Sequence, residues 1–228
     1  MVFAAGFGTR MGALTAERPK PLIELSGRSL IDRTLDLVEA AGIPRAVINL
    51  HYRAGMIRRH LAGRDRPEIA FSEERPAILD TGGGMRKALP LLHGDPVLGL
   101  NSDAVWQGNP LPALLAAWQD RMEALLLVVR RENALCHAGT GDFFLDASGR
   151  LARRGGRASA PYVYTGAQIL RTGRLAAAPS GAFSLNRIWD AMGADGGLFG
   201  LVWPRRWVDV GTPAGIEAAE ALLAEGTR

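Results

Sequence analysis

Cysteine is nearly absent from this chain: Cys136 is the only one among 228 residues, so no internal disulfide can form. Apart from the adjacent His137, no paired histidine or acid surrounds it, and we interpret it as a free thiol rather than a nucleophile. Long apolar runs are missing too. The longest, residues 124–129, is far below the roughly twenty residues of a membrane helix, and no charged segment followed by an apolar run begins the chain. We therefore expect a cytoplasmic protein without a membrane partner.

Lysine is also scarce, since Lys20 and Lys87 are the only lysines among 27 basic residues. The arginines are scattered along the chain, without a dense basic run or interleaved aromatics, so the net charge of +4 does not indicate a nucleic-acid partner. A chain that uses arginine for its surface charge draws attention to Lys20, because a compact ammonium and a planar guanidinium are not interchangeable. Lys87 is equally compatible with a solvated surface. The number of subunits stays open.

Residues 3–22 read FAAGFGTRMGALTAERPKPL and carry the strongest functional signal. Gly6 and Gly8 allow a sharp backbone turn and a close approach to a ligand, so that successive N–H groups can point at phosphate oxygens. Arg10 and Lys20 add positive charge to the same segment. This combination predicts a loop that binds a phosphorylated ligand.

Two familiar phosphate loops are excluded. The dinucleotide-binding fingerprint needs a third glycine at position 11, which is Met11, and an acidic residue after the second strand, where residues 49–52 read NLHY. A Walker loop needs a Gly-Lys pair at the start of a helix, and neither lysine follows a glycine. The chain is therefore neither a Rossmann dehydrogenase nor a P-loop kinase or ATPase.

The pattern G-x-G-T-R-M followed by P-K-P-L resembles the signature of the sugar-1-phosphate nucleotidyltransferases. Four later segments resemble further motifs of that family: a base-binding glycine loop, a metal-binding N-G-D strand end, a sugar-contacting turn and a second metal-binding segment, here LDTGGG (79–84), LNSD (100–103), YTG (164–166) and WVDVGT (207–212). The resemblance covers nearly the whole chain. Two departures stand out, because Ser102 replaces the usual glycine and the Glu-Lys-Pro lysine of other relatives has no counterpart.

The resemblance implies roles for particular residues. Arg10 would grip the β- and γ-phosphates, and Lys20 would bridge the α-phosphate and the sugar phosphate. Asp103 and Asp209 would hold Mg²⁺, an ion that one or two carboxylates plus phosphate oxygens commonly bind. The residues expected to contact the nucleotide are Ala5, Gly6, Gly8, Thr9, Thr81, Gly82, Gly83 and Asn101, and those expected to contact the sugar are Asp142, Thr165 and Gly166.

Within the family, the glycine loop, the GDF at residues 141–143, the YTG turn and the short RWVDVGT ending most resemble uridylyltransferases that act on N-acetylmuramate 1-phosphate in peptidoglycan recycling. Such an enzyme uses UTP and releases pyrophosphate. Three alternatives stay open: a mannose-1-phosphate guanylyltransferase, a non-catalytic nucleotide-sugar sensor and a molybdopterin nucleotidyltransferase. The joint presence of both metal carboxylates argues against a sensor, and the late position of Lys20 argues against the molybdopterin enzyme.

Apolar runs and helical patterns alternate along the chain, which predicts an α/β fold: a Rossmann-like, mostly parallel sheet with helices on both faces. The clearest helix, residues 29–41, opens with a capping box formed by Ser29 and Asp32 and stops at Gly42. The pattern predicts strands at 46–50, 69–72, 96–100 and 125–129, and further helices at 56–61, 85–92 and 111–121.

We expect one catalytic domain over residues 1–228, in which residues 1–131 bind the nucleotide and residues 132–228 bind the sugar. The second part would include a small β region over the sugar and a C-terminal helix, capped by Thr212 with Pro213 at its first position. Ligands of open α/β sheets bind outside the carboxyl ends of the strands. The motifs that follow the predicted strands can therefore converge on one crevice.

Overall fold

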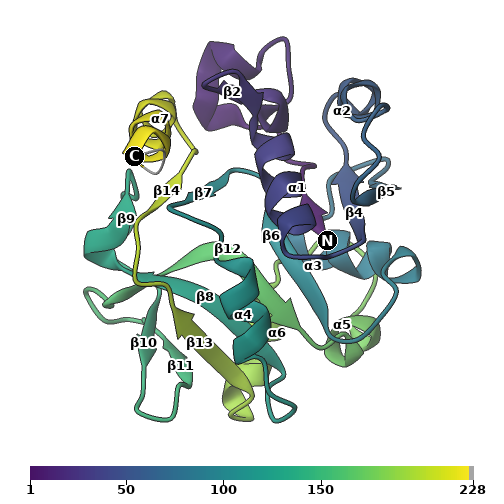
Figure 1. The fold of residues 1–228 in the computed structure, drawn as a ribbon. Coiled ribbons are helices and arrows are strands. Elements are labelled where there is room, and N and C mark those ends of the chain that lie inside the picture. Colours follow the sequence, from purple (N-terminus) through teal and green to yellow (C-terminus); the bar gives the residue numbers. More distant parts are fainter. Residues whose placement is uncertain (226–228) are drawn as a thin grey trace.

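The computed structural model describes residues 1–225, and its main feature is a nine-stranded sheet with helices on both faces (Figure 1). The strands of this sheet are β1 (Val2–Phe3), β4 (Arg45–Leu50), β5 (Glu68–Glu73), β6 (Val97–Asn101), β8 (Ala124–Arg130), β10 (Phe143–Leu145), β11 (Leu151–Arg153), β12 (Tyr162–Leu170) and β13 (Leu198–Val202). They are arranged in the order β11-β10-β12-β6-β1-β4-β5, with β8 paired to β12 and β13. The pairings give β11 and β12 one direction and the other strands the opposite one, which confirms the predicted mostly parallel sheet.

Two smaller sheets complete the strands. One has three strands, β7 (Ala104–Trp106), β9 (Ala134–Leu135) and β14 (Trp207–Asp209), and the other pairs β2 (Glu24–Leu25) with β3 (Arg28–Ser29). The helices are α1 (Leu30–Ala40), α2 (Ala54–His60), α3 (Asp80–Ala88), α4 (Leu111–Ala117), α5 (Gly173–Ala177), α6 (Asn186–Ala194) and α7 (Pro213–Glu225). Residues 1–225 contain no helix long and apolar enough to cross a membrane.

Strand β8 shows why both faces of the sheet are covered. Successive side chains of a strand point to opposite faces. Leu126 and Val128 pack in the core formed with α3, α5 and α6, whereas Leu125, Leu127 and Val129 pack in the core formed with α1 and α4. A continuous apolar run is therefore expected for a strand that is buried on both sides, and the run at residues 124–129 occupies that position.

The predicted helix at residues 29–41 is confirmed as α1. The Ser29 hydroxyl oxygen accepts a hydrogen bond from the Asp32 N–H (3.1 Å), as in a capping box, and Gly42 follows the helix in the left-handed region at φ 74°. The predicted C-terminal helix is confirmed as α7, which starts at Pro213. Helix α4 ends at Ala117, before the predicted end at residue 121.

The glycine segment differs from its prediction, because residues 80–88 form α3 rather than a loop followed by a helix. A Cβ at Gly82 would lie 2.4 Å from the Phe183 ring, and one at Gly83 would lie 2.2 Å from the Gly181 carbonyl oxygen. The glycines are thus needed where α3 packs against residues 181–183. The N–H groups of Gly82 and Gly83 donate to the Phe183 carbonyl (2.8 and 3.0 Å), so these two donors are already used within the protein, and contact of both residues with the nucleotide stays a prediction.

Candidate active site

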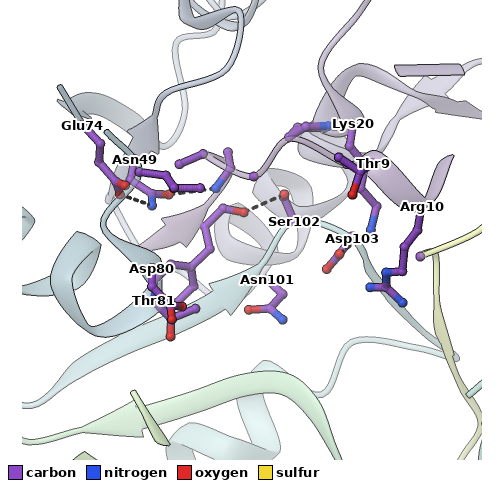
Figure 2. Close-up of a pocket in the computed structure, with 18 residues that line it drawn as sticks. Thr9, Arg10, Lys20, Asn49, Glu74, Asp80, Thr81, Asn101, Ser102 and Asp103 are labelled. Atoms are coloured by element: carbon purple, nitrogen blue, oxygen red, sulfur yellow. Dashed lines mark hydrogen bonds and ion pairs between the residues drawn. The ribbon is translucent and has the colours of Figure 1, made fainter. Parts of the chain in front are cut away.

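A cleft of about 330 Å³ opens at the carboxyl ends of β1, β4 and β6 (Figure 2). It is lined by Phe3, Ala4, Ala5, Gly6, Gly8, Thr9, Arg10, Lys20, Pro21, Asn49, Glu74, Ile78, Asp80, Thr81, Asn101, Ser102, Asp103 and Gly211. Figure 2 shows Arg10, Lys20 and Asp103 on one side and Asn49 with Glu74 on the other. We call these two sides the Lys20 end, which also includes Asp209, and the Glu74 end.

At the Lys20 end, the ammonium Nζ lies 2.5 Å from Asp103 Oδ2. Lys20 lies between Pro19 and Pro21 and is the first residue of a short 3₁₀ turn (Lys20–Leu22). Its side chain is only 11% exposed. The phosphate loop lies directly against this lysine: Gly8 has φ 68°, and a Cβ there would lie 2.9 Å from Lys20 Cβ. The loop and the lysine are therefore packed as one unit.

Asp209 joins the Lys20 end through the small sheet. In the antiparallel pairing of β14 with β7, Asp209 lies opposite Ala104, and the Val210 N–H donates to the Asp103 carbonyl (3.0 Å). Two aspartates from distant parts of the sequence are thereby brought to one site. The Asp209 carboxylate is also 3.7 Å from the guanidinium of Arg10, whose side chain is 67% exposed.

The electrostatics at this end are set by two carboxylates and the basic side chains around them. Burial, and next the negative charge of Asp103, raise the pKa of Asp209, while Lys20, Arg10 and His137 act in the opposite direction. Two carboxylates that repel each other provide hard oxygen ligands for a dication. Within residues 1–225 there is no arrangement of three or more acidic, histidine or cysteine side chains suited to a metal. An ion held by this pair would need further ligands from phosphate or water, as Mg²⁺ commonly does.

The Glu74 end was not predicted from the sequence. Asn49 Oδ1 accepts a hydrogen bond from the Ala4 N–H (2.8 Å), and its Nδ2 donates to Glu74 Oε1 (2.7 Å). Glu74 is fully buried, and its second oxygen accepts from the Leu79 N–H (2.6 Å). The sequence did contain a pattern that could have indicated this pair. Asn49 is the second-last residue of β4 and Glu74 directly follows β5, so both lie at the edge of the sheet where ligands bind.

Asn101 and Ser102 lie between the two ends. Asn101 is the last residue of β6, and Gly166 lies against it, since a Cβ at Gly166 would be 2.9 Å from Asn101 Cβ. The Ser102 hydroxyl donates to the Phe3 carbonyl (2.7 Å). The side chain that replaces the family's glycine thus bonds to the backbone of β1.

The residues predicted to contact the sugar do not line this cleft. Asp142 accepts a hydrogen bond from the Tyr164 N–H (2.9 Å), and Thr165 is fully buried, with its hydroxyl donating to the Leu127 carbonyl (3.0 Å). Both side chains therefore bond to the backbone around the register shift of β12 beside Gly166, and contact of these residues with the sugar stays a prediction. Of the residues predicted for the nucleotide, the catalytic pair and the metal, those that do line the cleft are Ala5, Gly6, Gly8, Thr9, Arg10, Lys20, Thr81, Asn101 and Asp103.

The chain is similar to nucleotidyltransferases in sequence. Residues 1–191 match the family model described as "MobA-like NTP transferase domain". The chain is 41% identical to an N-acetylmuramate alpha-1-phosphate uridylyltransferase from Caulobacter vibrioides, over 99% of this chain and 96% of that protein. It is 31% identical to a protein of the same name from Neisseria meningitidis serogroup B, over 97% and 96% of the two chains.

A solved structure gives the same fold. HddC from Yersinia pseudotuberculosis, crystallised with GMP-PN, superimposes with a TM-score of 0.79 at 21% sequence identity, over 97% of each chain. At this identity the match supports the architecture of the sheet and its helices.

Proposed function

The chain belongs to the MobA-like NTP transferase family, and we propose that it transfers a uridylyl group from UTP to a sugar 1-phosphate, N-acetylmuramate 1-phosphate, with release of pyrophosphate. The observation that carries this proposal is the Lys20 end of the cleft, where two basic side chains and two carboxylates converge beside the phosphate loop. The proposed reaction is cytoplasmic and returns an amino sugar to cell-wall synthesis.

The chemistry requires charge control rather than a general base. The attacking sugar phosphate oxygen is already anionic, so the protein must bring two anions together and stabilise the charge that develops on the leaving pyrophosphate. Lys20, held between the loop and Asp103, would contact the α-phosphate and the incoming sugar phosphate. Arg10, which is exposed at the rim, would contact the leaving phosphates.

Asp103 and Asp209 fit a magnesium ion, because the pairing of β14 with β7 brings the two residues together and each supplies hard oxygen ligands. Bound there, Mg²⁺ would neutralise part of the phosphate charge. Lys20 and Arg10, which pair with Asp103 and Asp209 in the structure, would then contact phosphate oxygens instead.

The nucleotide and the sugar would occupy different parts of the chain. Apart from Gly211, every residue that lines the cleft comes from residues 3–103, which supports the assignment of residues 1–131 to the nucleotide. We assign the sugar to residues 132–228, which contribute Asp209 and border Asn101 through Gly166. The names of the two relatives favour UTP and N-acetylmuramate 1-phosphate. Mannose-1-phosphate guanylyl transfer is the second candidate, because the chain is also 26% identical, over 93% of its length, to a mannose-1-phosphate guanylyltransferase catalytic subunit beta from Dictyostelium discoideum.

Pyrophosphate release measured with UTP, GTP, CTP, dTTP and ATP, each against several sugar 1-phosphates, tests the proposal. We expect the highest kcat/KM for UTP with N-acetylmuramate 1-phosphate and no release after chelation of Mg²⁺. The two lysines provide a matched pair of variants: Lys20→Ala should lose about 100-fold or more in kcat, whereas Lys87→Ala, on the exposed side of α3, should retain activity. A preference for GTP with mannose 1-phosphate would support the second candidate, and nucleotide-sugar binding without release would indicate a sensor.

A further inference from the structure

Phe7 is a large apolar residue between Gly6 and Gly8, near the start of the phosphate loop, and the reaction proposed above gives it no role. Its neighbours Gly6 and Gly8 line the cleft, but Phe7 does not, and it is 46% exposed. Its ring centroid lies 5.4 Å from that of His51 in an edge-on arrangement (89°) and 5.7 Å from that of Tyr52. Such separations are those of favourable aromatic pairs. The ring therefore packs against the turn that follows β4.

That turn is itself anchored at several points. The ring nitrogen Nδ1 of His51 lies 2.8 Å from the Glu74 carbonyl oxygen. The Tyr52 hydroxyl donates to the Thr15 carbonyl (3.0 Å), and Arg53 Nη2 donates to the Ala16 carbonyl (2.6 Å). Residues 51–53 thus hold the phosphate loop near its start through Phe7 and near its end through residues 15 and 16.

The phosphate loop also contacts the Lys20 end, so the position of the loop affects the packing of Lys20. The Thr15 hydroxyl donates to the Gly8 carbonyl (3.0 Å), and Gly8 lies in tight contact with both Thr15 and Lys20. A displacement of the loop away from residues 51–53 would therefore move the N–H groups at positions 8–10 and loosen the packing on the lysine. The aromatic contacts lie outside the cleft, so they can fix the loop without touching the ligand.

We propose that Phe7, His51 and Tyr52 form an aromatic clasp that positions the phosphate loop for the triphosphate, and that Phe7 is a positioning residue for nucleotide binding. The proposal rests on the function proposed above. Loss of the clasp should weaken triphosphate affinity more than it changes kcat at saturating substrate, because the groups that act on the phosphates remain.

The test compares four variants by calorimetric titration with Mg²⁺–UTP, steady-state kinetics and thermal unfolding. Phe7→Ala should raise Kd and KM for the triphosphate about tenfold, with kcat within about threefold of wild type, since two aromatic contacts are lost. Phe7→Tyr keeps the ring and should restore wild-type affinity. Tyr52→Phe, which loses the bond to Thr15, should raise Kd about threefold. Leu14→Ala, in the same segment and 44% exposed, is the control and should bind as wild type.

Equal Kd values for Phe7→Ala and wild type would overturn the clasp, as would an equal weakening by Leu14→Ala or a failure of Phe7→Tyr to restore binding. Binding is measured without an acceptor, so the clasp can be judged even if N-acetylmuramate 1-phosphate is not the sugar substrate. A wild-type protein that binds no triphosphate would instead contradict the proposed function, and the clasp with it.

Discussion

The two ends of the cleft are built in different ways. At the Lys20 end the charged groups pair with one another, and their exposure ranges from 11% for the Lys20 side chain to 67% for Arg10. At the Glu74 end the polar side chains are buried and bonded to the backbone of Ala4, directly after β1, and of Leu79, directly before α3. Charges that pair only with one another can exchange these partners for phosphate oxygens during a reaction. The saturated contacts of Asn49 and Glu74 instead fix the shape of the cleft.

Asp103→Asn is expected to have the largest effect, because it changes a proposed metal ligand and removes the counter-charge of Lys20 together. We predict a loss of about 100- to 1,000-fold or more in kcat with little change in melting temperature, since the proposed magnesium ion and the preorganised charges act on the transition state. Pyrophosphate release at several Mg²⁺ concentrations measures this. Asp120→Asn, at a fully exposed position, is the control and should behave as wild type. Normal turnover of the Asp103 variant would remove the metal assignment.

At the Glu74 end, Glu74→Ala should mainly lower the stability of the fold rather than act on the reaction itself. The substitution leaves the Leu79 N–H and the Asn49 amide without a partner in a buried position, which we expect to destabilise the fold by about 2–4 kcal/mol. Glu73→Ala is a matched control one residue earlier, where the carboxylate makes only solvent-accessible ion pairs and its loss should lower the free energy of unfolding far less. Denaturant unfolding measures both, and equal losses would contradict the structural role of Glu74.

The contrast between the ends explains what could be predicted from the sequence. Arg10 and Lys20 fall in one contiguous motif, and Asp103 and Asp209 each follow a short apolar segment, so local pattern was enough. The pairing of Asn49 with Glu74 exists only after β4 and β5 pair and place both residues beside β1. Neither residue belongs to a local motif, so their contact depends on tertiary structure.

The fold shows the same division. Short apolar runs predicted β4, β5, β6 and β8 to within one residue, most clearly at β8, because a strand buried on both faces leaves a continuous apolar pattern. The small sheet of β7, β9 and β14 has strands of two or three residues, too short for any periodicity. Glycine has a low helix propensity, and α3 forms through its glycines because close packing against residues 181–183 overrides that propensity.

Gly83→Ala tests this override and should have a smaller effect than Glu74→Ala. A methyl group 2.2 Å from the Gly181 carbonyl oxygen would force the backbone apart, at an expected cost of about 1–3 kcal/mol. Gly55→Ala is the matched control in α2, where the nearest atom to the new methyl group is the end of the Arg59 side chain at 3.5 Å. That change should instead stabilise the protein by about 0.5–1 kcal/mol. Destabilisation by both variants would show that the packing argument is wrong.

Asp209→Asn should give the smallest change in stability. It should also move stability and activity in opposite directions. Burial and the charge of Asp103 raise the pKa of Asp209 in the folded protein. A raised carboxylate pKa favours folding at low pH, and that contribution disappears as the pH rises through the folded pKa. At neutral pH the ionised Asp209 therefore destabilises the metal-free fold.

Replacing it with asparagine should raise the melting temperature of the metal-free protein at pH 7 by roughly 1–3 °C, while activity is lost. The difference should shrink as the pH falls through the raised pKa of Asp209, because the wild-type carboxyl then takes up its proton. Thermal unfolding of both proteins in chelator, between pH 4.5 and 8, measures this. An equal or lower melting temperature for the variant at pH 7 would mean that Arg10 and Lys20 fully compensate the charge of Asp209. In that case the charged groups of the Lys20 end, like the polar groups of the Glu74 end, would be fully paired within the protein without a ligand.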